Sequence, residues 1–136
     1  MEKWKEIFEK TIPIGKYQVS VKNGDEAGLL IKLESNEYFV DINFGAVSAL
    51  RMLDEGILLN ELYNNQTIAK YKNNGFSNVI YQVLEGEFDT FVRNACNELY
   101  DYLKLKHFII ITMNYVTEVI SEWEPVIKVT TKKHTA

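Results

Sequence analysis

Charged residues inside apolar runs are the features of this sequence that could do chemistry. The segment RMLDEG (51–56) places Arg51 in such a run, Asp41 and Glu118 each interrupt another, and His107 precedes a third. A buried arginine is rare unless it is paired, and its planar guanidinium fits a carboxylate best. We therefore expect a structural polar cluster of Asp41, Arg51, Glu118 and His107, in which Arg51 binds Asp41 or Glu118 across the sheet.

Two interpretations of this cluster stay open from the sequence. Antiparallel sheets commonly have one covered face and one solvated face, and the charged residues would then lie on the solvated one. Asp41 and Arg51 stand at similar distances from a turn at Gly45, a spacing compatible with a cross-strand pair, and Glu118 stays open as the other partner. Alternatively, the cluster lines a pocket in a small enzyme or ligand-binding domain.

No known catalytic or metal-binding motif accompanies these residues. The sequence contains no HExxH, CxxC, GxSxG, Walker or GxGxxG pattern. The only cysteine, Cys96, has no adjacent base to lower its pKa, so we expect a structural thiol. The carboxylates of GDEAG (24–28) lack the spacing of a calcium-binding loop. We predict no catalytic residue, no metal site and no cofactor, and therefore a protein that is not an enzyme.

Composition is that of an ordinary globular protein, with 46% hydrophobic and 25% charged residues among 136. This length predicts a single domain over 1–136. The net charge of −4 disfavours direct nucleic-acid binding, which needs clustered Lys and Arg. No run approaches the roughly 20 apolar residues of a membrane span, and the N-terminus does not resemble a signal peptide. With one cysteine, the chain is expected to be cytoplasmic.

Hydropathy patterning predicts an α+β fold. Alternation with period two indicates strands at 17–22, 29–34, 37–44, 46–53, 78–85, 107–114, 115–121 and 126–131. Short turns between them favour a mostly antiparallel meander of about 6–8 strands. Residues 56–77 have no clear pattern and are expected to cross from one part of the sheet to another. Residues 132–136 are expected to form a frayed tail.

Two helices are predicted beside the strands. Residues 1–12 have apolar residues at helical spacing before Pro13 and predict a short N-terminal helix. Residues 87–106 predict one long amphipathic helix packed on one face of the sheet. Its apolar stripe consists of Phe88, Phe91, Val92, Ala95, Leu99, Tyr102 and Leu103.

Three short segments occur in an order that resembles a protein family. They are RMLDE at a strand end, EGEFDTF at a helix start, and HFIIITMNYVTEVISEWEP over a strand pair. Together they resemble small uncharacterised bacterial α+β proteins, some of them immunity proteins of polymorphic or contact-dependent toxin systems. The resemblance spans residues 36–127, and it departs from the family pattern at Gly86, where a serine usually precedes the acidic helix start. It implies no catalytic residues.

The resemblance favours a non-enzymatic, cytoplasmic binding protein that neutralises a cognate toxin by occluding its active site. The partner would be a protein, such as a basic nuclease domain, whose phosphate site attracts carboxylates. Candidate partner-binding residues are Asp25, Glu26, Asp54, Glu55, Glu85, Glu87 and Asp89. Besides the enzyme alternative, a structural homo-oligomer that pairs edge strands through VIKVTT (126–131) stays open.

Overall fold

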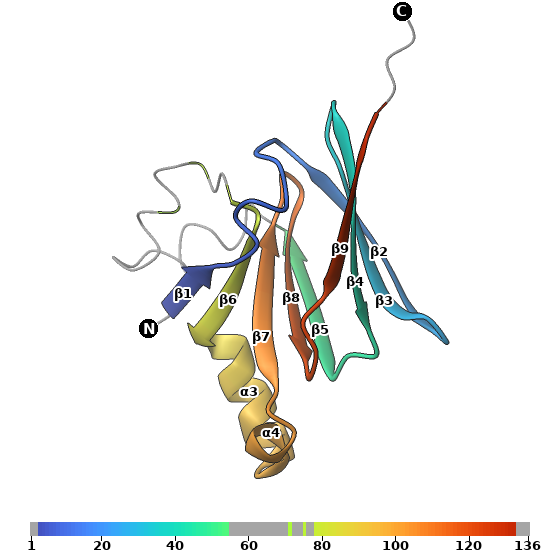
Figure 1. The fold of residues 1–136 in the computed structure, drawn as a ribbon. Helices are drawn as coiled ribbons and strands as arrows, with labels where there is room; N and C mark the ends of the chain where they lie inside the picture. The colour runs from blue at the N-terminus through green and yellow to red at the C-terminus, as the bar shows by residue number, and fades with distance from the viewer. Residues whose placement is uncertain (1–2, 55–70, 72–74, 76–77, 133–136) are drawn as a thin grey trace, which may run out of the picture.

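The computed structural model describes residues 3–54, 71, 75 and 78–132, and these form two antiparallel sheets and two helices (Figure 1). Sheet A contains, in spatial order, β1 (Lys3–Glu6), β6 (Ile80–Glu85), β7 (Lys106–Ile111), β8 (Tyr115–Ser121) and β5 (Ala49–Asp54). Sheet B contains β2 (Gln18–Asp25), β3 (Gly28–Glu34), β4 (Tyr38–Gly45) and β9 (Val126–Thr131). The chain therefore has a mainly antiparallel α+β fold, as its pattern predicts.

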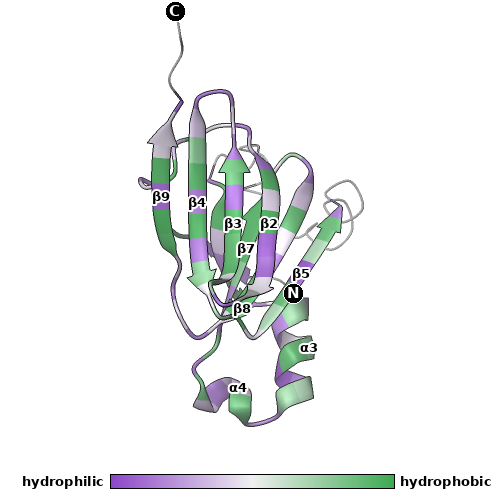
Figure 2. Ribbon diagram, turned by 90° about the vertical axis from the view of Figure 1, so that its right-hand side faces the viewer, coloured by the Kyte–Doolittle hydropathy of each residue, from purple (hydrophilic) through white to green (hydrophobic). Residues whose placement is uncertain are grey.

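The main core lies between the two sheets, which pack face to face. Alternate residues of β3 and β4 are buried and contact the inner face of sheet A. The rings of Phe44 in sheet B and Phe108 in sheet A are 5.4 Å apart between centroids. Figure 2 shows that hydrophilic and hydrophobic residues alternate along the strands of sheet B. Each fully buried aliphatic or aromatic side chain stabilises this interface by about 1.5–3 kcal/mol.

The expected single meander with about 6–8 strands is wrong in one respect, because nine described strands divide between two sheets. The meander prediction holds locally for β2, β3 and β4, which pair in sequence order. After β4, however, β5 crosses to sheet A and pairs with β8, while β9 returns to pair with β4. Alternation along a strand indicates only that one face of its sheet is buried, and it does not indicate what covers that face. Here each sheet covers one face of the other.

The expected helix over 87–106 is two helices, α3 (Glu87–Cys96) and α4 (Leu99–Tyr102), which lie at one end of the sheets (Figure 1). Asn97 has a left-handed φ of 53° and ends α3. The break changes the direction of the chain, so the predicted apolar stripe is not one continuous face. Two members of that stripe are exposed, Phe91 on α3 at 68% and Tyr102 on α4 at 80%.

The expected N-terminal helix is also wrong, because residues 3–6 form β1 at the edge of sheet A. Trp4 is buried between exposed Lys3 and Lys5, and its ring lies 5.3 Å from that of Tyr81. Pairing with β6 therefore overrides a local pattern that suits a helix. At the other terminus, the predicted edge strand over 126–131 is confirmed as β9.

Several predicted features lie in parts of the chain that the structure does not describe. Of the segment 56–77, the structure describes only Tyr71, which packs on Tyr81 in sheet A, and Gly75. Residues 133–136 of the predicted tail are also outside the described residues. Lys132 is described, and its Nζ lies 2.6 Å from an Oε2 of Glu34. Among the described residues, no helix has the length and hydropathy needed to cross a membrane.

Replacement of Gly28 by alanine tests the close approach of β3 to the end of β4. A Cβ at Gly28 would overlap the carbonyl group of Gly45, and Gly28 has a φ of +78°. Gly24 has a φ of +97° but no atom within 4 Å of such a Cβ, so it is a matched control. We expect G24A to lose about 1 kcal/mol and G28A at least about 2 kcal/mol more in urea unfolding. Equal losses would contradict the contact.

Candidate functional site

A row of charged residues lies on the face of sheet A that points away from sheet B. Arg51 on β5 stands directly opposite Glu118 on β8. His107 on β7 pairs with Ile120, two residues beyond Glu118 and therefore on the same face. Helix α3 begins one residue after β6, and this short connection places its first turn over the same end of the sheet.

Arg51 binds Glu118 through two nitrogen atoms. Its Nε donates to Oε2 of Glu118 at 2.7 Å, and its Nη2 contacts the same oxygen. Its Nη1 lies 3.6 Å from Oε1 of Glu87 at the start of α3. The guanidinium carbon lies 4.8 Å from the centre of the Phe88 ring, a cation–π contact. Arg51 thus joins two strands and a helix.

His107 connects Glu118 to helix α3. Its Nε2 is 2.9 Å from Oε1 of Glu118, and its Nδ1 is 3.3 Å from Oδ1 of Asp89. His107 is 1% exposed, Glu118 0% and Asp89 5%. We call Arg51, Asp89, His107 and Glu118 the buried charge network.

His107 is expected to carry a proton in this network. Burial disfavours the imidazolium, but hydrogen bonds with Asp89 and Glu118, together with their negative charges, outweigh it and raise the pKa of His107 above 6.5. A neutral imidazole has one N–H and cannot donate to both carboxylates, whereas the imidazolium can. Protonation therefore completes the connection between α3 and sheet A.

The buried charge network is built to hold elements together. Its acids and base have no exposed surface on which a substrate could rest, since His107 and Glu118 are almost completely buried. Within the described part of the chain, no three His, Cys, Asp or Glu side chains are placed to hold a metal ion. The network can therefore fix the first turn of α3 on the sheet, and it neutralises charges that would otherwise be costly to bury.

Of the predicted cluster, the structure brings together Arg51, Glu118 and His107 but not Asp41. Of the two pairings expected for Arg51, the one with Asp41 does not occur, because β4 and β5 belong to different sheets. Asp41 is half-buried on β4, where its cross-strand neighbours are Lys32 and Lys128. Of the two carboxylates considered for Arg51, its partner is Glu118. The solvated-face interpretation suits Asp41 alone.

The sequence predicts Asp89 to be one of the exposed partner-binding carboxylates, and this prediction is wrong because Asp89 is buried. Asp89 is buried against His107 because it follows Phe88, whose ring lies edge-on to the imidazole with centroids 5.7 Å apart. Both residues lie in the first turn of α3, which faces the sheet. The sequence does place Asp89 directly after Phe88 in the first turn of α3, and His107 at the start of β7. These positions are compatible with the observed contact between Asp89 and His107.

The other predicted partner-binding carboxylates do not form one surface. Glu26 is exposed between β2 and β3 of sheet B, whereas Glu85 and Glu87 are exposed where β6 meets α3. Asp54 is exposed and pairs with Tyr115 at the start of β8, the end of sheet A opposite to α3. The side chain of Asp25 and the whole of Glu55 lie outside the described residues.

A different surface emerges at the end of the molecule that carries α3 and α4. We call this surface the helical end and define it as residues 85–106 and 118–124. Large hydrophobic side chains are exposed there, namely Phe91, Leu99, Tyr102, Leu103 and Trp123. With Arg51, these segments contain eight acidic and four basic residues. Counting also Lys3, which lies 3.7 Å from Glu85, and the protonated His107, the formal charge of this end is −2. The helical end is therefore both apolar and acidic.

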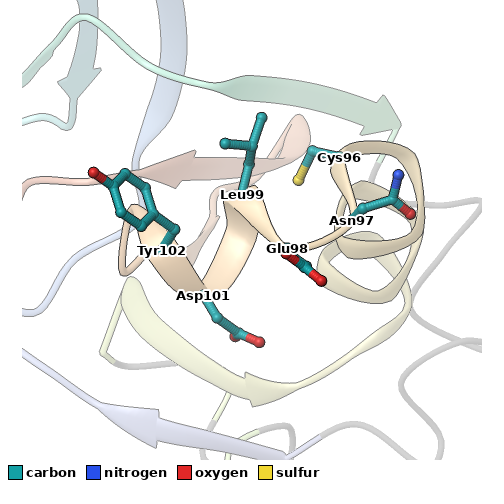
Figure 3. Close-up of a pocket in the computed structure, with 6 residues that line it drawn as sticks. All are labelled: Cys96, Asn97, Glu98, Leu99, Asp101 and Tyr102. Carbon is teal, nitrogen blue, oxygen red and sulfur yellow. The ribbon is translucent and has the colours of Figure 1, made fainter.

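A shallow, open depression of about 970 Å³ lies where α3 meets α4. Its lining residues are Cys96, Asn97, Glu98, Leu99, Asp101 and Tyr102. Figure 3 shows the carboxylates of Glu98 and Asp101 directed to one side of α4, with Leu99 and Cys96 on the other.

No protein-family model matches this chain, and no curated protein or solved structure matches it. Function is therefore argued from the chemistry of the sites alone.

Replacement of Glu118 by glutamine tests the buried charge network. The change leaves Arg51 and His107 without their shared carboxylate, so we expect a loss of about 3 kcal/mol in the free energy of unfolding. Asp41→Asn is the matched control, and we expect it to stay within about 0.5 kcal/mol of wild type. Urea unfolding at pH 7 measures both. A loss as small for E118Q as for D41N would contradict the network.

Stability should also depend on pH through His107. Because its folded-state pKa is raised, protonation stabilises the fold fully below about pH 6.5, and this contribution is lost as pH rises through the folded-state pKa. We expect the urea midpoint to fall between pH 6 and pH 9 in wild type and to fall less in His107→Gln. An equal fall in both proteins would show that other groups cause the pH dependence.

Proposed function

We propose that this protein is a non-enzymatic binding module, and specifically an immunity protein that neutralises a cognate bacterial toxin by occluding its active site. The observation that carries the proposal is the helical end, where exposed apolar side chains lie among exposed carboxylates. Apolar patches rimmed by charge are typical of protein-binding surfaces.

The exposed side chains of the helical end are of the type that anchors interfaces. Phe91, Leu99 and Tyr102 are 68%, 55% and 80% exposed, on helices that otherwise bury few residues. Aromatic residues give most binding energy when a partner buries them. An interface centred on them would gain more than a surface of carboxylates alone.

The acidic character of the helical end favours a basic partner. A net negative charge at one end accelerates association with a positively charged surface and makes that association sensitive to salt. The active site of a nuclease has such a surface, because it binds phosphates. The proposed partner is accordingly a basic toxin domain, met in the cytoplasm without a cofactor or a direct contact with nucleic acid.

The burial of the charge network supports binding over catalysis. An enzyme that used His107 and Glu118 would have to expose them to substrate, and both are almost fully buried. Their contacts with Arg51 and Asp89 instead fix α3, which presents Phe91 to solvent. The network thus supports a binding surface and does not form a reaction site.

Protection from toxicity tests the proposal directly. The C-terminal domain encoded by the gene immediately upstream would be expressed in a heterologous bacterial host, with and without this chain. We expect growth arrest when the domain is expressed alone and full growth when this chain is expressed with it. The affinity of the purified complex should fall as the salt concentration rises. Phe91→Ala should reduce affinity for the domain by about ten-fold or more, as expected for an anchor residue.

Ile14→Ala provides the matched control, because Ile14 is 76% exposed but lies between β1 and β2, outside the helical end. We expect this variant to bind and protect as wild type does. Growth arrest that persists in the presence of the chain would contradict the immunity function. Equal effects of F91A and I14A would contradict the assignment of the surface.

A further inference from the structure

The depression between α3 and α4 has two chemically distinct parts. Leu99 and Tyr102 give it exposed apolar surface, while Glu98 and Asp101 give it carboxylates (Figure 3). An occupant that satisfies both parts must combine an apolar group with a positive charge. Arginine and lysine have this character, because each carries its charge on an aliphatic stem.

Asp101 already binds a guanidinium in this structure. Its Oδ1 lies 2.6 Å from Nη1 of Arg93, whose guanidinium carbon lies 4.0 Å from the centre of the Tyr100 ring. Glu98, in contrast, has no ion pair with any described residue, although it is exposed on the rim of the same depression. One carboxylate of the depression thus has a cation, and the other is open to one.

We propose that this depression is the docking site for an arginine, with an adjoining apolar side chain, on the basic partner. The proposal rests on the function proposed above, and it names the type of side chain through which the partner would bind. The guanidinium would bind Glu98 and the outer face of Asp101, and the apolar neighbour would pack on Leu99 and Tyr102. Arginine fits better than lysine, because its planar group binds carboxylates in two places and stacks on aromatic rings.

Charge complementarity selects a basic partner over a second copy of this chain. The helical end carries a net negative charge, so two copies that met through it would bring like charges together. A basic segment would instead neutralise Glu98 and gain apolar burial on Leu99 and Tyr102 in one contact.

A small probe tests the site without the toxin. Isotope-labelled protein would be titrated with acetyl-leucyl-arginine amide, with acetyl-leucyl-citrulline amide as the neutral isostere. We expect saturable shifts at the backbone amides of 96–102 with the arginine probe, at a Kd on the order of millimolar. The citrulline probe should bind about five-fold more weakly, because it retains the apolar contact but lacks the charge.

Paired variants give the control. Glu98→Gln with Asp101→Asn should weaken the arginine probe about five-fold and leave the citrulline probe unchanged. Glu37→Gln removes an equally exposed carboxylate between β3 and β4 and should have no effect. Shifts spread over acidic residues elsewhere, or equal binding of both probes, would overturn the proposal. So would a dimer that the double variant disrupts, because the occupant would then be a second copy.

The two proposals fail in different ways. If the chain protects against the toxin but the arginine probe does not bind, the docking site is wrong and the immunity function stands. If the probe binds as expected but the chain gives no protection, the site is real and the partner is not the toxin.

Discussion

Glu118 is a fully buried carboxylate, and the arrangement at the helical end depends on it. One of its oxygens accepts from Arg51 and the other meets His107, so it joins β5, β7 and β8 at one place. The desolvation of such a group is expensive unless every charge has a partner. Because His107 extends the contact to Asp89 on α3, the sheet and the helix depend on the same carboxylate.

The charge network adds to a small apolar cluster in attaching helix α3. Its buried residues are Phe88 and Asp89, both in the first turn, and Phe88 packs on the charged side chains of Arg51 and His107. Most helices on sheets are held by a continuous apolar stripe. Here a small apolar cluster, in which Phe88, Val92, Cys96 and Tyr100 pack with Ile120, attaches both helices to the sheet, and charged contacts add to it at the first turn of α3.

Period-two alternation was enough to predict most strands and the antiparallel pairing, because alternation is a local property of a half-buried sheet. It could not predict two sheets, since β5 and β9 change sheets through contacts with residues far along the chain. The same limit explains the candidate site. The sequence predicts that Arg51 binds a carboxylate, but it gives no reason to prefer Glu118 over Asp41. The strand register of the structure decides, because it places Glu118 opposite Arg51. Asp89 was misassigned because exposure was inferred from charge, whereas His107 makes its burial favourable.

A charged attachment of α3 has a consequence for recognition. If the predicted stripe held the helix, Phe91, Leu99 and Tyr102 would face the sheet and be lost to a partner. Attachment through Phe88, Val92, Cys96 and Tyr100, with Asp89 and His107 at the first turn, leaves these side chains in solvent on helices that are still fixed. A fixed surface loses less conformational entropy on binding than a mobile one, so more of the apolar contact appears as affinity. The apolar cluster and the buried charges together thus make an exposed apolar surface compatible with a defined structure.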